Sequence, residues 1–283
     1  MINYLRFKRL SLFGALLALC VVVLGAYVRL SDAGLGCPDW PGCYGALTVP
    51  QSEAAIKNAQ EVFPHSTIET GKAWKEMAHR YLAGTLGIVV LTIGALGWRS
   101  KQHLKVSPLL PTALLLIIAF QAALGMWTVT MLLKPAIVSA HLIGGMTTLA
   151  LLTWIAHRHW CAISQQSTAT PLLTLAIRGA IIVLLAQIFL GGWTSTNYAA
   201  LACTDFPTCH GVWMPEMDFK DAFHLVRELG QSANGGNLTL SALTAIQWVH
   251  RIGALVTFVY LGSLALLLIT IPAFKKIGIL LAL

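Results

Sequence analysis

Charged side chains are scarce in this sequence. Of its 283 residues only 11% are Asp, Glu, Lys or Arg, whereas 57% are hydrophobic. A soluble domain carries about 25% charged residues, so this shortage excludes an ordinary soluble domain and indicates that most of the chain lies in lipid. We therefore predict an all-α integral membrane protein, for which membrane lipid is the first partner.

The sequence also lacks the signals of a cleaved leader. The start, residues 1–12, is too short and too weakly basic for a mitochondrial transit peptide. The first apolar stretch runs into Tyr27, Val28 and Arg29 with no cleavage site of small residues. We expect this stretch to stay as an anchor and the protein to lie in a bacterial inner membrane.

Long apolar runs, by contrast, are abundant. A bilayer-spanning helix needs roughly 20 mostly apolar residues. Six windows meet this requirement: 10–28, 78–97, 109–130, 136–156, 172–194 and 243–271. The final residues, 277–283, are typical of a seventh span that stops after about two turns. We expect the sequence to be a fragment of a longer protein.

The net charge of +8 is distributed in a regular way along the chain. If the spans simply alternate in direction, the clusters of basic residues between them all lie on one side: Arg6, Lys8 and Arg9; Arg99, Lys101 and Lys105; Arg158; Lys275 and Lys276. This is the positive-inside pattern, which predicts a cytoplasmic N-terminus. Topology accounts for the charge, and we expect no nucleic-acid partner.

Two long loops between the spans, 29–77 and 195–242, share a motif. Both contain C-x-D-[WF]-P-x-C-x-G, from Cys37 to Gly45 and from Cys203 to Gly211. A His-Arg pair follows each loop at a similar offset: His79-Arg80 and His250-Arg251. The segments 121–127 and 187–193 are also alike, as QAALGMW and QIFLGGW. The agreement predicts two homologous four-helix halves in the same orientation, 1–160 and 161–283, the second truncated before its last span.

Three histidines lie in the first turns of predicted spans, each entering from the outer side. They are His79, His141 and His250. Ionisable groups inside membrane spans are expensive and usually functional. Imidazole is a common axial ligand of haem iron, and facing helices can place two rings on opposite faces of one porphyrin. A core histidine satisfied by a neighbour is the structural alternative for each.

Pairing His79 with His141 gives one haem site in the first half. The repeat then pairs His250 with a histidine near position 312, beyond residue 283. Glycines close to these histidines would let a flat macrocycle approach the backbone, although helix packing explains them equally well: Gly84, Gly87, Gly144, Gly145 and Gly253.

The two halves differ three residues before the repeated histidine. Glu76 precedes His79 on the same helical face, whereas Gln247 precedes His250. A carboxylate near a reacting centre can act as an acid or base, so this difference indicates proton chemistry in one half and electron storage in the other. The alternative is a capping or interfacial glutamate, since Lys72 and Lys75 are close by.

The loop cysteines fall on the oxidising side of the membrane, where disulfides persist. Closure of Cys37 with Cys43 and of Cys203 with Cys209 is one interpretation, and a redox-active role for the first pair is the other. The spacing is not C-x-x-C, and a zinc site would need more ligands than the loops supply.

These motifs together resemble the haem A synthase family. The resemblance rests on LGAYVRLSDAGLGCPDWPGC at 24–43, on E-x-x-H-R at 76–80 and on the His-Arg pair at 250–251, and it covers essentially the whole sequence. Members have eight spans in two four-helix halves and convert haem O to haem A for cytochrome oxidase. They oxidise a porphyrin methyl group by successive hydroxylations, after which the hydrated product loses water to give a formyl group.

The resemblance implies a role for each site residue. His79 and His141 would flank the substrate haem O, and Glu76 would be the catalytic carboxylate. His250 would hold a haem b cofactor with the histidine beyond residue 283, and Cys37 and Cys43 would match the functional cysteine pair. Haem O synthase would supply the substrate and an unidentified partner would exchange electrons, while a monomer and a homo-oligomer both stay open.

Two other classes compete with this interpretation. A non-catalytic di-haem electron carrier of the cytochrome b type explains the paired histidines but not the difference between Glu76 and Gln247. A quinone-linked thiol oxidoreductase would explain the loop cysteines but needs no histidines inside the membrane.

Overall fold

The computed structural model describes residues 2–99, 101–103, 109–160, 170–232 and 234–283. Lys105 and the predicted start of the second half at residue 161 lie outside them. The described residues form the following helices: α1 (Ile2–Leu30), α2 (Glu53–Val62), α3 (Thr70–Arg99), α4 (Leu109–Thr130), α5 (Pro135–Trp160), α6 (Pro171–Thr196), α7 (Phe219–Ala222), α8 (Leu240–Thr270) and α9 (Lys275–Ala282). Short 3-10 turns lie at Lys101–His103 and Ala199–Leu201.

Six of these helices are long and apolar enough to cross a membrane: α1, α3, α4, α5, α6 and α8. Each contains one of the six predicted windows almost entirely, and the described part of the chain has no β-strand. The prediction of an all-α integral membrane protein is confirmed. The predicted seventh apolar segment forms the eight-residue helix α9.

Two of the histidine-bearing helices begin before their apolar windows, because the helical hydrogen bonding continues into the segment that precedes the window: α3 begins at Thr70 and α8 at Leu240. His79 is consequently the tenth residue of α3 and His250 the eleventh of α8, whereas α5 begins at Pro135 and His141 is its seventh residue. The histidines lie about two to three turns inside their helices, and for His79 and His250 this is deeper than the apolar windows predict.

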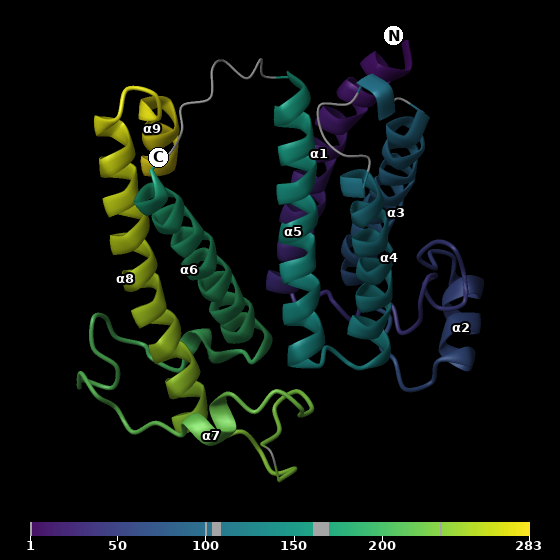
Figure 1. Cartoon of the computed structure of the whole chain (residues 1–283). Coiled ribbons are helices and arrows are strands. Elements are labelled where there is room, and N and C mark those ends of the chain that lie inside the picture. The colour runs from purple at the N-terminus through teal and green to yellow at the C-terminus, as the bar shows by residue number, and fades with distance from the viewer. Residues whose placement is uncertain (1, 100, 104–108, 161–169, 233) are drawn as a thin grey trace. The chain divides into compact units, whose positions relative to one another are not determined.

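The chain forms two compact units, Met1–Ile163 and Ser164–Leu283. In the first unit α1 packs against α3 and α5, and α4 packs against the same two helices. Figure 1 shows these four helices side by side. They close into a four-helix ring in which α3 and α5 occupy opposite corners, and α2 belongs to the loop between α1 and α3.

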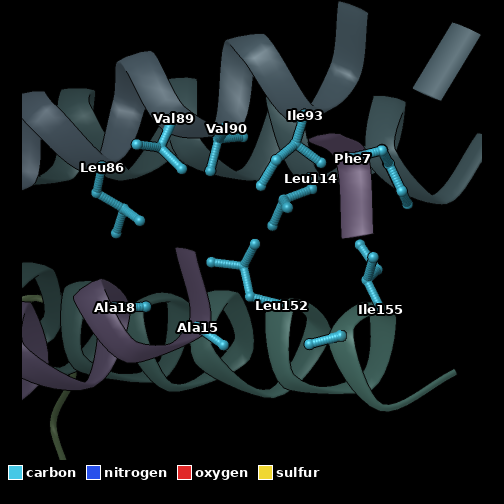
Figure 2. Close-up of a cluster of buried hydrophobic side chains, with 11 residues drawn as sticks. Phe7, Ala15, Ala18, Leu86, Val89, Val90, Ile93, Leu114, Leu152 and Ile155 are labelled. Atoms are coloured by element: carbon cyan, nitrogen blue, oxygen red, sulfur yellow. The ribbon is translucent and has the colours of Figure 1, made fainter. Parts of the chain in front are cut away.

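The apolar core of the first unit fills one end of this ring. Figure 2 shows its side chains pointing toward one another from α1, α3, α4 and α5. Phe7, Ile93, Leu114 and Ile155 are fully buried there. They come from the first turns of α1 and α4 and the later turns of α3 and α5, which is the end of the ring that carries the N-terminus. His79 and His141 lie toward the other end.

In the second unit α8 packs against α6, α7 and α9. The loop between α6 and α8 is the second motif-bearing loop, and its short helix α7 contacts α8. Trp193 near the end of α6 is fully buried and donates a hydrogen bond from its indole nitrogen to the carbonyl of Ala222 in α7, at 2.8 Å. This bond ties the loop to the end of α6.

Candidate functional site

Each candidate histidine packs against a glycine of the membrane-spanning helix that precedes its own. A Cβ atom on the glycine would lie close to Cε1 of the ring in three pairs: Gly25 and His79 at 2.9 Å, Gly125 and His141 at 3.4 Å, and Gly191 and His250 at 3.3 Å. A leucine precedes each of these glycines. The imidazoles therefore lie directly on the backbone of α1, α4 and α6, and this contact limits where each ring can lie.

His79 and His141 come from opposite corners of the first unit, yet their rings are near enough to interact electrostatically. Each ring approaches a main-chain group of its neighbouring helix, at Val21 for His79 and at Gln121 for His141. Even so, Nδ1 of both rings is buried and has no well-formed hydrogen bond to any residue that the structure describes. Two neighbouring, incompletely satisfied imidazoles suit the binding of an external ligand such as haem iron.

The glycines near the histidines divide into two kinds. Gly144 and Gly253 leave room for the amides of Gln121 and Gln187, whose atoms would lie 1.8 Å and 2.4 Å from an added Cβ. These two serve helix packing. Gly84 and Gly87, which follow His79 on α3, have nothing within 4 Å of such a Cβ. Gly84 is exposed on the surface of the unit, so the open space beside it is no evidence of a haem pocket.

Both pairs of loop cysteines form disulfides, with S–S distances of 2.05 Å for Cys37–Cys43 and 1.99 Å for Cys203–Cys209. The prediction of closure within each loop is confirmed.

The aspartate of the motif shapes the loop around the disulfide. Asp39 accepts hydrogen bonds from the backbone N–H groups of Tyr44 and Gly45, at 2.6 Å and 2.8 Å. Tyr44 and Gly45 both have positive φ, at 55° and 77°, which explains the glycine of the motif.

The second loop repeats this arrangement residue for residue. Asp205 accepts from the N–H groups of His210 at 2.7 Å and Gly211 at 3.0 Å, and these residues also have positive φ. A hydrogen bond from the Thr208 hydroxyl, followed by that from Gly211, lowers the pKa of Asp205 from 3.8 to about 2. The carboxylate therefore stays ionised and keeps the turn in place at neutral pH.

The arginine beside each repeated histidine holds the loop through its main-chain oxygens. Arg80 donates to the carbonyl of Asp39 at 2.8 Å and also to those of Pro41 and Gly42. Arg251 donates to three carbonyls of the second loop: Asp205 and Thr208 at 2.8 Å and Cys203 at 2.9 Å. The His-Arg pair thus places the disulfide loop next to the candidate ligand in both halves.

Glu76 adds a connection that the second half lacks. One carboxylate oxygen accepts from the N–H of Cys37 at 2.9 Å, and the other accepts from the guanidinium of Arg80. The side chain is only 6% exposed. Gly36 also packs tightly on α3, since an added Cβ would lie 2.6 Å from the backbone of Lys72. Glu76 is therefore the point at which the disulfide, the arginine and the histidine-bearing helix meet.

The alternative of an interfacial glutamate paired with lysine is wrong. Lys72 pairs with Glu69 at 3.1 Å and with Asp32 at 3.5 Å, and the partner of Glu76 is Arg80. At the equivalent place in the second unit, the side-chain oxygen of Gln247 is buried without a partner among the described residues. Glu76 and Gln247 therefore differ in their contacts as well as in residue type, since only the Glu76 side chain binds the loop and the arginine.

Comparison with known proteins gives the family. The family COX15-CtaA, described as cytochrome oxidase assembly protein, matches residues 8–283. The chain belongs to this family. It is 45% identical to the heme A synthase of Shewanella oneidensis over 265 residues, which is 93% of this chain and 79% of that protein. The heme A synthase of Halalkalibacterium halodurans is 26% identical, covering 86% of this chain and 77% of its own length. That of Shouchella clausii is 27% identical, covering 97% and 86%.

The sequence did not reveal the roles of two groups of site residues. These are the glycines that touch the imidazole rings and the two arginines that bind the loops. Repeated Leu-Gly pairs at 24–25, 124–125 and 190–191 were a usable signal for the glycines. Repetition of the arginine after His79 and His250 was the signal for Arg80 and Arg251, although their loop carbonyl partners appear only in the folded chain.

Proposed function

We propose that this chain is a haem A synthase, which oxidises a methyl group of haem O to the formyl group of haem A. The observation that carries the proposal is the 45% identity to a heme A synthase over 93% of the chain. The neighbouring histidines His79 and His141, near the anchored disulfide loop, support it. A simple electron carrier would explain the histidines but gives no reason for the contacts of Glu76.

In this proposal His79 and His141 hold the substrate haem O between α3 and α5. Gly25 and Gly125 set the position of the two rings because each imidazole lies against one of them. The disulfide loop is attached to α3 beside His79 by Arg80.

When water supplies the oxygen, each hydroxylation of the methyl carbon releases two electrons to the external partner and two protons, so a proton-accepting group is needed nearby. We assign this role to Glu76, which is on the same helix as His79 and one turn before it. Its oxygens already accept hydrogen bonds from Cys37 and Arg80, so the carboxylate is held in one orientation. The Cys37–Cys43 disulfide shapes the loop together with Asp39 and Arg80.

His250 would hold the cofactor haem b together with the second histidine that the internal repeat predicts beyond residue 283. Haem b, when bound, supplies a one-electron redox centre. The incompletely satisfied amide of Gln187 next to His250 fits a ligand site that is completed by iron. We further propose that haem O synthase delivers the substrate and that an external partner exchanges the electrons.

We also infer an inner-membrane location with the N-terminus in the cytoplasm. The basic residues at the ends of α1, α3, α5 and α8 support this orientation. It places both disulfide loops in the oxidising compartment, where the bonds persist.

The proposal is tested by separating the two haem sites. The intact protein is expressed in a bacterial host that supplies haem O, and the bound haems are extracted and identified. We expect His250→Ala to remove haem b, and we expect His79→Ala to keep haem b but form no haem A. His65→Ala, at an exposed loop position, is the matched control and should behave as wild type. Loss of the same haem from both variants would contradict the division into substrate and cofactor sites.

A further inference from the structure

We propose that Gln187 is the positioning residue of His250, accepting a hydrogen bond from Nδ1–H of the imidazole when Nε2 binds iron. This inference rests on the proposed haem b site at His250. The uncharged side chain of Gln187, on α6, would thus favour the tautomer of His250 that carries its proton on Nδ1.

The contacts of Gln187 single it out in the second unit. Its amide nitrogen lies 3.0 Å from Nδ1 of His250 and 3.3 Å from the main-chain oxygen of the same residue. Gly253, one turn after His250, leaves the room that the amide occupies. The amide oxygen is buried and has no hydrogen-bond partner in the described part of the chain.

An imidazole can bind iron through Nε2 only if that nitrogen carries a lone pair and the proton is on Nδ1. With the amide nitrogen of Gln187 donating to Nδ1, the proton is instead held on Nε2. The two ends of an amide have nearly the same shape, so rotation of the group brings its unpaired oxygen to Nδ1. The rotation gives up the 3.3 Å bond from the amide nitrogen to the main-chain oxygen of His250. The amide oxygen then accepts from Nδ1–H, and the lone pair of Nε2 is free for the metal.

The other two histidines provide an internal comparison. Gln187, Gln121 and Val21 occupy the same position, four residues before the glycine that touches the ring. Gln121 donates to the main-chain oxygen of His141 at 3.1 Å but makes no hydrogen bond to its Nδ1 within the described residues. Val21 has no polar side chain at all. Only in the second unit does a side-chain amide bond to the ring itself.

This difference has a chemical consequence for the cofactor site. An acceptor on Nδ1–H makes the imidazole a stronger electron donor, which stabilises ferric more than ferrous iron. Gln187 would thus lower the reduction potential of haem b. The two rings of the substrate pair approach main-chain groups, at Val21 and Gln121, in place of a side-chain amide.

The test is a potentiometric titration of haem b in the purified intact protein, with haem content measured on the same sample. Gln187→Leu keeps the size but removes the acceptor, whereas Gln187→Glu keeps an acceptor oxygen. We expect Gln187→Leu to raise the midpoint potential and to weaken haem b binding by about 10–100-fold. Gln187→Glu should keep the potential at or below that of the wild type. The matched control is Gln121→Leu, which should leave the potential unchanged.

The two Gln187 variants decide the inference together. A rise in potential of equal size in both variants, or no rise in either, would overturn it. If Gln187→Leu retains too little haem for titration, retention of haem by Gln187→Glu supports the role of the acceptor, and equal loss from both overturns it. His250→Ala run in parallel separates the two proposals. Retention of haem b by that variant rejects the haem b site itself, whereas its loss supports that site, and the Gln187 variants then test the hydrogen bond alone.

Discussion

Replacement of Glu76 by glutamine tests the most connected residue of the site. The change is nearly isosteric and copies the residue that the second half has at Gln247. In the wild type both carboxylate oxygens accept hydrogen bonds, one from Cys37 N–H and one from Arg80. An amide has a single acceptor oxygen, so the variant can keep only one of these two bonds.

The cost to the fold follows from this count. The amide is also uncharged, so the variant breaks the buried ion pair with Arg80. A buried donor left without an acceptor costs about 1–3 kcal/mol, and a buried charge that loses its partner costs about 3–5 kcal/mol. Arg80 keeps its bonds to the main-chain oxygens of the loop. In the second unit Arg251 holds the equivalent loop beside an amide. We therefore expect the variant to fold and to keep its haem ligands.

Catalysis should be affected far more strongly than folding. An amide cannot exchange a proton with a reacting hydroxyl or water, and loss of general acid–base help typically costs about 10²–10⁴-fold in rate. The assay supplies haem O to the intact protein and quantifies haem O, haem A and hydroxylated intermediates per mole of bound haem. Glu69→Gln is the matched control, since Glu69 is an exposed glutamate paired with Lys72.

Two results would refute this reasoning in different ways. Near-normal formation of haem A by Glu76→Gln would remove Glu76 from the chemistry and leave it as a loop anchor. A loss of haem A accompanied by much faster reduction of the Cys37–Cys43 disulfide would show that the loop had detached. In that case the carboxylate acts through the position of the loop and not by proton transfer.

Two further predictions concern the loops. A thiol reagent that cannot cross the inner membrane should label Cys37 and Cys203 in intact cells after reduction, and labelling that needs a broken membrane would contradict a cytoplasmic N-terminus. The second is a pH effect: because folding lowers the pKa of Asp205 from 3.8 to about 2, its stabilisation of the second loop is complete at neutral pH and is lost as the pH falls from about 4 to about 2. A phosphine reductant should therefore reduce Cys203–Cys209 faster as the pH falls across that range. The variant Asp205→Asn should show no such pH dependence. If Asp205→Asn keeps the pH dependence, Asp205 is not its cause.

The sequence predicted the helices and the disulfides because both depend on local information. An apolar run long enough to cross a bilayer forms a helix whatever its neighbours are, and each disulfide closes a short loop of one motif. The contacts of individual side chains depend on neighbouring helices, which composition does not reveal. The hydrogen bond from the N–H of Cys37 to Glu76, which joins residues 39 positions apart, is the clearest case.

The depth of the histidines shows the same limit. Apolar windows locate the part of a helix that suits lipid, but the helical hydrogen bonding extends beyond it on the outer side. The start of α3 at Thr70 therefore lies eight residues before the predicted window at 78. This first part of α3 is packed against the loop, at Gly36 and Cys37, and hydropathy does not report such contacts.

One sequence observation acquires its meaning only from the fold. The likeness of 121–127 to 187–193 spans 66 residues, whereas the loop motifs repeat after 166. The structure accounts for both offsets. α1, α4 and α6 each place a glycine against the histidine of the next long helix, so the smallest repeated element is a pair of helices, and two such pairs make one half.

The way in which Arg80 and Arg251 hold their loops bears on how the two halves could diverge. Both guanidinium groups bind main-chain oxygens of the loops, and a main-chain oxygen is the same whatever side chain its residue carries. Natural selection could therefore exchange Trp40 for Phe206 or Tyr44 for His210 while the loop kept its outline. A duplicated gene would in this way inherit one rigid frame and two independent surfaces on which to evolve different chemistry.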